Sequence, residues 1–201
     1  MNKRWRDPIE FLPAVDVQAL LDGLTDTNYS TIKLAERVAA MRELPIVLLA
    51  CPIPTPECYG WWLTSPLCEF IVYERDTFVS HQNHIIFHEL AHILLGHQTV
   101  ALSQEKAHEL LSRCHSLELV ASAQGRVYAG IATTLQDTAR DADVLLREMA
   151  DVHAALKETE AESLATLLQR ELIRRVGFMA LTHPSQNHTM RQIVEGLRLD
   201  H

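Results

Sequence analysis

The sequence has no long uncharged apolar run and little positive charge, and both absences narrow its function. Its apolar stretches fall well short of the roughly 20 residues that cross a membrane. The basic N-terminus is not followed by the apolar core of a signal peptide. Asp and Glu outnumber Lys and Arg by 26 to 18, for a formal net charge of −8. We therefore expect a cytoplasmic protein with no membrane partner. We also expect no direct nucleic-acid partner, because nucleic-acid binding favours a basic face.

Cysteines are few and scattered. The four are Cys51, Cys58, Cys68 and Cys114, and no two have C-x-x-C spacing. In a chain without an export signal this pattern predicts reduced thiols rather than disulfides, and it disfavours a structural zinc site made of cysteines. The 201 residues are 47% hydrophobic and contain no internal repeat, which is typical of one globular domain with a sizeable core.

Periodicity predicts an α+β fold that is mainly helical. Short apolar runs predict three strands, and the last two, separated by Ser65-Pro66, suggest an antiparallel hairpin. Trp61 and Trp62 read as core and sheet-face residues. Beyond Gly96 the pattern is helical almost throughout. The expected strands are 46–50, 59–64 and 67–73, and the expected helices are 15–24, 29–44, 80–95, 103–123, 133–156, 158–176 and 189–199.

The helix expected at 80–95 contains the motif H-E-x-x-H, formed by His88, Glu89 and His92. Residues four apart lie on one helical face, so the two histidines can share one Zn²⁺ ion. Glu89 is then placed to accept a proton from water. If the motif bound no metal, three polar side chains would be buried in an apolar helix, and each unsatisfied group would cost about 1–3 kcal/mol of stability. We therefore interpret the motif as a metal site.

A catalytic zinc ion needs a third protein ligand. The sequence lacks the H-E-x-x-H-x-x-G-x-x-H extension, and His97, five residues after His92, lies off the ligand face. A downstream glutamate is the alternative. On the helix expected at 158–176, Glu160 lies beside the apolar stripe, which favours it only narrowly over Glu158 as the third ligand. Glu162 lies on the more solvent-exposed side of this helix. The glutamates considered are Glu105, Glu109, Glu118, Glu148, Glu158, Glu160 and Glu162.

Two segments resemble the ImmA/IrrE family of metallo-endopeptidases: residues 88–97, H-E-L-A-H-I-L-L-G-H, and residues 160–165, E-A-E-S-L-A. The similarity covers mainly 30–100 and 155–175. It implies a zincin-like single domain over 1–201, with a three-stranded sheet packed on the H-E-x-x-H helix. It also implies that Glu160 is the third zinc ligand and that the substrate is a helix-turn-helix repressor. The segment 103–156 between the two motifs is longer than compact members of the family need, which suggests that it is a helical insertion.

These features predict a zinc-dependent endopeptidase with Glu89 as general base and residues 67–73 as a strand for an extended substrate. Two alternatives remain open: a non-proteolytic regulatory or toxin-antitoxin binding module, and a hydrolase of non-peptide amides. Two further histidines are candidates for the site. His84 lies one turn before His88, where a partly exposed polar residue is also expected, and His183 follows in a late loop.

Overall fold

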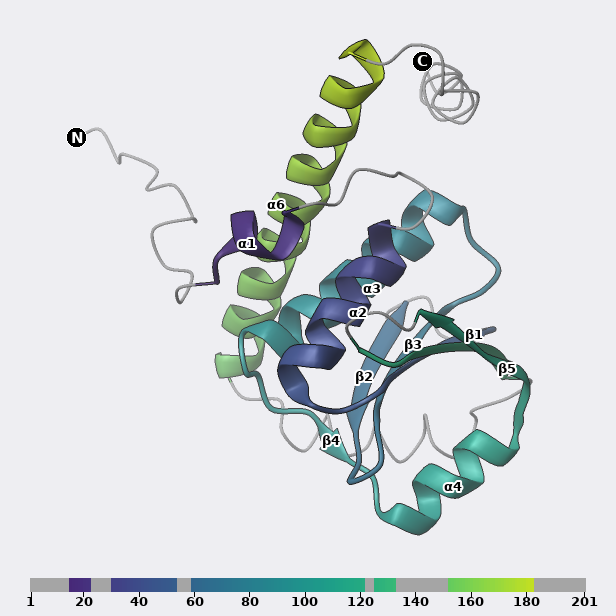
Figure 1. Ribbon diagram of the computed structural model, residues 1–201. Helices are drawn as coiled ribbons and strands as arrows, with labels where there is room; N and C mark the ends of the chain where they lie inside the picture. The colour runs from purple at the N-terminus through teal and green to yellow at the C-terminus, as the bar shows by residue number, and fades with distance from the viewer. Residues whose placement is uncertain (1–14, 23–29, 54–58, 122–124, 133–151, 183–201) are drawn as a thin grey trace.

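The computed structural model describes residues 15–22, 30–53, 59–121, 125–132 and 152–182, which form a mixed α/β structure (Figure 1). Helices lie on both faces of one central sheet. The helices are α1 (Val17–Leu21), α2 (Ser30–Arg42), α3 (Val79–Leu94), α4 (Gln104–Ser112) and α6 (Val152–Thr182). The strands are β1 (Ile46–Cys51), β2 (Gly60–Thr64), β3 (Glu69–Glu74), β4 (Val100–Ala101), β5 (Cys114–Ala121) and β6 (Val127–Ala132).

Within the described ranges the sheet has six strands, in the order β4-β2-β3-β1-β6-β5. Strand β1 lies near its middle and runs parallel to both β3 and β6, while β2 is antiparallel to β3. The sequence of β1, I-V-L-L-A-C, is apolar at every position because helices cover both faces of the sheet there. Strand β4 forms the edge of the sheet beyond β2 and pairs with β2 only at Leu63 and Thr64.

Two hydrophobic layers hold the helices to the sheet. On one face, Leu48, Trp62 and Ile71 pack with apolar side chains of α2, α3 and α6. On the other face, Val47 and Trp61 pack with apolar side chains of α4. Alternation along β2 sends the adjacent tryptophans to opposite faces, as a pleated strand requires. Both tryptophan side chains are buried, which confirms their interpretation as core residues.

The expected three-stranded sheet and helical insertion at 103–156 are wrong in the described part of the chain. The predicted helix at 103–123 ends at Ser112, and β5 and β6 follow it. Strand β6 pairs with β1 along five positions from Val127 to Ile131, so this segment extends the central sheet rather than forming an added lobe. The order also places β3 inside the sheet, where its edges are already paired and no substrate strand can be added. Residues 133–151 and 189–199 lie outside the described residues.

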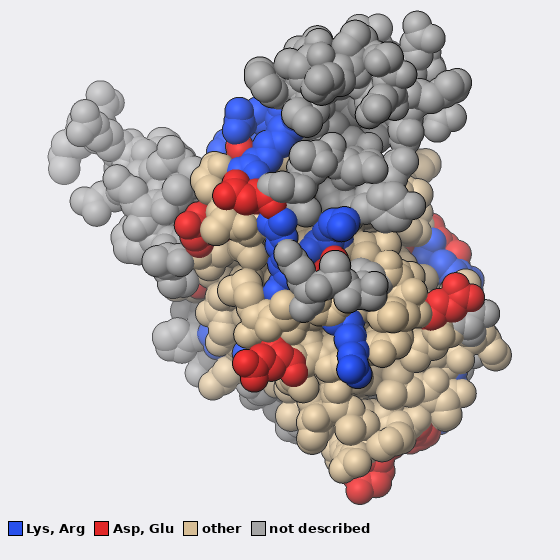
Figure 2. Space-filling model, in the orientation of Figure 1, with Lys and Arg blue, Asp and Glu red and all other residues tan. Residues whose placement is uncertain are grey.

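The surface of the described residues carries charges of both signs. On the face shown in Figure 2, small groups of basic and acidic side chains are interspersed over an otherwise uncharged surface. Within the described ranges, no helix combines the length and the apolar character that a membrane span requires.

Candidate metal centre

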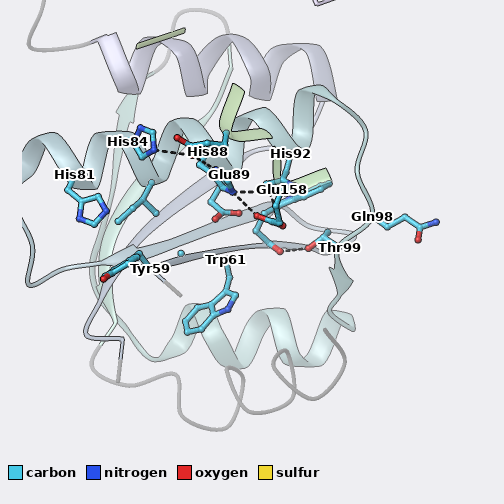
Figure 3. Close-up of a pocket in the computed structure, with 14 residues that line it drawn as sticks. Tyr59, Trp61, His81, His84, His88, Glu89, His92, Gln98, Thr99 and Glu158 are labelled. Carbon is cyan, nitrogen blue, oxygen red and sulfur yellow. Dashed lines mark hydrogen bonds and ion pairs between the residues drawn. The ribbon is translucent and has the colours of Figure 1, made fainter. Parts of the chain in front are cut away.

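Helix α3 brings the motif residues to the sheet. Its buried face includes Ile86, Phe87 and Leu90, and this face packs against the central sheet. His88 and His92 lie one turn apart on the side that faces α6, with their ring centroids 4.8 Å apart. Figure 3 shows His84, His88 and His92 along α3, with Glu158 approaching from α6. The sequence therefore predicted correctly that the two motif histidines share one helical face.

Three potential ligand atoms converge between α3 and α6. The Nε2 atoms of His88 and His92 are 3.1 Å apart. The Glu158 carboxylate lies 3.1 Å from His88 Nε2 through Oε2 and 3.5 Å from His92 Nε2 through Oε1. Tetrahedral zinc with bonds of about 2.0–2.1 Å places its ligand atoms roughly 3.3 Å apart. His88, His92 and Glu158 therefore form a group that could hold a metal ion.

The outer ring nitrogens explain why these atoms need a cation. His88 Nδ1 lies 3.2 Å from the Glu162 carboxylate, which only accepts hydrogen bonds, so this nitrogen carries the proton. In a neutral ring, Nε2 of His88 then presents a lone pair to Glu158 and His92. Two lone-pair donors and a carboxylate facing one another repel unless a proton or a metal ion lies between them. The donor set thus fits Zn²⁺, which prefers nitrogen and carboxylate oxygen ligands in this number.

Glu89 points toward the same cleft from a buried position. Its side chain is enclosed between α3 and β2, and the backbone N–H of Trp62 donates a hydrogen bond to its carboxylate. Burial raises the pKa of Glu89 to about 7, although the two neighbouring histidines lower it. A carboxyl with a pKa near neutrality can both accept and return a proton at cellular pH, which is the property that a general base requires.

The charges around the cleft also perturb His88 and Glu158. Burial lowers the pKa of His88, but its hydrogen bond to Glu158 and the nearby Glu89 charge outweigh burial and raise the pKa to about 8. The neighbouring rings of His88 and His92 hold the pKa of the Glu158 carboxyl far below its usual range. Glu158 therefore stays ionised and available as a ligand at neutral pH.

Gly60 makes the close approach of α3 and β2 possible. A Cβ atom added there would collide with the Ile85 side chain and lie 3.1 Å from Glu89 Oε1. A glycine at this position of β2 thus leaves room for the general-base candidate, as glycine in a strand commonly does where another group approaches closely.

The convergent residues open into a cleft of about 540 Å³. Strand β2 forms one wall, α3 another, and Glu158 and Glu162 of α6 close one side. The residues that line it are Tyr59, Gly60, Trp61, Trp62, His81, His84, Ile85, His88, Glu89, His92, Gln98, Thr99, Glu158 and Glu162. The cleft is large enough for several residues of an extended chain or for a small ligand.

The structure does not bring the expected third ligand, Glu160, together with His88 and His92. Its carboxylate lies 3.3 Å from His97 Nε2 instead, and Glu158 takes the expected place. Glu162, expected on the wetter side of its helix, contacts His88. The missed signal was the four-residue spacing of Glu158 and Glu162, which puts both carboxylates on one face of α6.

The other two histidine candidates differ in outcome. His84 lines the cleft, and its ring nitrogens lie 3.0 Å from Gln169 Oε1 and 3.2 Å from Glu162 Oε2. It is not part of the metal-binding group found among the described residues. His183 lies outside the described residues.

Comparisons of the chain with protein-family models, with curated proteins and with solved structures gave no match.

Proposed function

We propose that the chain is a zinc-dependent endopeptidase. The observation that supports this most strongly is the convergence of His88 Nε2, His92 Nε2 and the Glu158 carboxylate beside buried Glu89. Three ligands leave a fourth position for a reacting group, whereas a purely structural zinc site closes with four protein ligands. The carboxylate next to the first histidine has no purpose in a structural site, but a hydrolase needs it as a base.

The chemistry divides between the ion and the chain. When bound by His88, His92 and Glu158, a zinc ion polarises carbonyl groups and increases the acidity of water. Glu89 accepts one proton from the water molecule that attacks the scissile carbonyl carbon. It then delivers this proton to the departing amine nitrogen as the C–N bond breaks. The products are a carboxylic acid and an amine, and Glu89 returns to its starting state.

The substrate is a protein in this proposal. The cleft lies beside strand β2, whose residues Gly60 to Trp62 line it, so an extended peptide can pass the ligand cluster. The resemblance of residues 88–97 and 160–165 to ImmA/IrrE endopeptidases supports a helix-turn-helix repressor as the substrate. The sequence predicted that β3 would contact the substrate, but β3 lies inside the sheet. Strand β2 is instead the strand nearest to such a substrate.

Cleavage of a helix-turn-helix repressor encoded beside this chain's gene, followed by mass spectrometry, tests the proposal. The zinc-loaded protein should cut one or a few internal peptide bonds. Glu89→Gln should retain zinc but cleave about 10²–10⁴-fold more slowly, because the amide cannot act as base. Glu118→Gln, which changes an exposed carboxylate on β5, is the matched control and should cleave normally.

Two results would contradict the proposal. Cleavage by Glu89→Gln at the wild-type rate would exclude Glu89 as the general base. Tight binding of the repressor by the zinc-loaded protein without cleavage would favour a regulatory binding module instead.

A further inference from the structure

His92 and His97 contact each other through their Nδ1 atoms, which are 2.9 Å apart. The contact depends on how α3 ends. The helix stops at Leu94, and Gly96 adopts a left-handed conformation with φ of 65°. This turn lets the His97 backbone N–H donate to the His92 carbonyl oxygen at 3.1 Å and folds the His97 ring back onto the His92 ring. A continued helix would have directed His97 elsewhere.

Glu160 completes a chain of three side chains. Its Oε2 atom lies 3.3 Å from His97 Nε2, on the opposite side of the imidazole from His92. Only 7% of the His97 side chain is exposed, and Glu160 is partly covered at 33%. A nearly buried imidazole between two fixed partners has little freedom to rotate or to exchange these partners for water.

The hydrogen-bond partners fix where each proton lies. A carboxylate only accepts, so His97 Nε2 carries a hydrogen that it donates to Glu160. Neutral His97 then has a lone pair on Nδ1, which accepts a hydrogen from His92 Nδ1. His92 is thereby left with its lone pair on Nε2, the atom that lies 3.1 Å from His88 Nε2 in the ligand cluster. Both the tautomer and the ring orientation of His92 follow from Glu160.

We propose that His97 and Glu160 are a positioning pair that holds His92 as a metal ligand. The proposal rests on the proposed metal centre and adds two residues to it that do not touch the ion. Ligand histidines usually give their second ring N–H to a carboxylate, a backbone carbonyl or water. Here an imidazole stands between the ligand and the carboxylate. On α6, Glu158 is thus the ligand, Glu162 contacts His88, and Glu160 acts on His92 through His97.

Zinc affinity and the cobalt spectrum test the positioning pair. His97→Phe keeps a flat aromatic ring but cannot accept the His92 hydrogen, and it should weaken zinc binding about 10–100-fold in a chelator competition titration. It should also shift the visible absorption bands of the Co²⁺-substituted protein, because these bands respond to ligand orientation. His97→Gln can accept the same hydrogen through its amide oxygen, and it should recover most of the lost affinity.

Glu160→Gln provides a second variant at a more exposed position that does not threaten the core. It removes the charge that fixes the His97 tautomer, and it should weaken zinc binding measurably and alter the cobalt bands in the same direction as His97→Phe. The matched controls are His108→Phe and Glu105→Gln on α4, which lies on the opposite face of the sheet. Both controls should bind zinc as the wild type does.

The outcomes separate the positioning pair from the metal centre. Wild-type zinc affinity and unchanged cobalt bands in both His97→Phe and Glu160→Gln would overturn the positioning pair and leave the metal centre intact. A wild-type protein that binds no zinc would overturn the metal centre, and the positioning pair with it.

Discussion

Glu158 lies 3.1 Å from His88 although 70 positions separate the two residues in the chain. Helix α6 crosses α3 at this point, and the apolar side chains Ala161, Leu164 and Ala165 on α6 are fully buried in the core that they share with α3. The packing of two helices thus sets the distance between a carboxylate and an imidazole. The backbone position of Glu158 is thus fixed, because moving α6 relative to α3 would disturb the core.

We expect Glu158→Ala to abolish tight zinc binding, because a site with two ligands remains. Glu162→Ala should weaken binding by less, since it removes only the partner of His88 Nδ1, an effect typically of about 10–100-fold. Zinc titration of the two variants beside the wild type measures this order. In the metal-free protein, Glu158→Ala also removes the partner that raises the pKa of His88, so the free energy of unfolding should fall, by at most about 1 kcal/mol because the Glu158 side chain is 61% exposed. Undiminished zinc affinity in Glu158→Ala would exclude it as a ligand.

The sequence predicted one part of this site because its signal is local. The four-residue spacing of His88 and His92 determines their common face wherever α3 lies, so helix periodicity was sufficient. The first three strands were also predicted, with ends close to those observed, because each is a short apolar run between turn residues. The burial of Ala161, Leu164, Ala165 and Leu168 on α6 was likewise predicted from periodicity and is confirmed.

The third member of the candidate group, Glu158, was missed because its position beside the histidines depends on tertiary packing. The sequence analysis sought a glutamate beside the buried stripe of α6 and favoured Glu160. The ligand face of α6 is instead the one that borders the open cleft, where Glu158 and Glu162 are half exposed or more. Strands β5 and β6 were missed for a related reason. Leucines at helical spacing in 103–123 suggested a helix, whereas β6 pairs with β1 and β5 pairs with β6, and this pairing decides the structure.

We expect Gly60→Ala to damage the site while the ligands remain. The added methyl group meets Ile85, a β-branched side chain with little freedom on a helix, and presses on Glu89. Overpacking of this kind costs typically about 1–3 kcal/mol, which denaturant unfolding can measure. Repressor cleavage should fall by more than zinc affinity because Glu89 is displaced and the ligands are not. Gly130→Ala on β6 is the control, since its nearest neighbour is the flexible end of the Leu117 side chain at 3.2 Å.

An ion pair between half-exposed Arg42 and buried Glu69 supports the strand that carries Trp62. Glu69 is fully buried, accepts a hydrogen bond from Arg42 Nη2 at 2.9 Å and accepts another from Trp62 Nε1 at 2.6 Å. Arg42→Met leaves the carboxylate in the core without its cation and should cost about 1–3 kcal/mol of unfolding free energy, less than a fully buried pair would, because the Arg42 side chain is 43% exposed. Arg113→Met breaks the more exposed pair with Glu109 and should cost at most about 1 kcal/mol. Equal losses in the two variants would show that burial of Glu69 does not matter.

The stability of the metal-free protein should fall as the pH rises. The pKa of Glu89 is raised from 4.5 to about 7 and that of His88 from 6.5 to about 8, so the folded state binds more protons than the unfolded state over this range. The stabilisation from Glu89 is complete below its unfolded pKa and is lost as the pH passes 7, and that from His88 is lost as the pH passes 8. Glu158 stays ionised throughout and contributes no change.

Urea unfolding of chelator-treated protein at several pH values measures this effect. We expect a loss of roughly 1–3 kcal/mol between about pH 5 and about pH 9. Glu89→Gln removes one of the two titrating groups, so its stability should depend less on pH, whereas Glu118→Gln should behave as the wild type does. Saturating zinc should reverse the trend, because the metal replaces the proton that His88 must release and binds more tightly as the pH rises. A metal-free protein that becomes more stable toward pH 9 would contradict the raised pKa values of both groups.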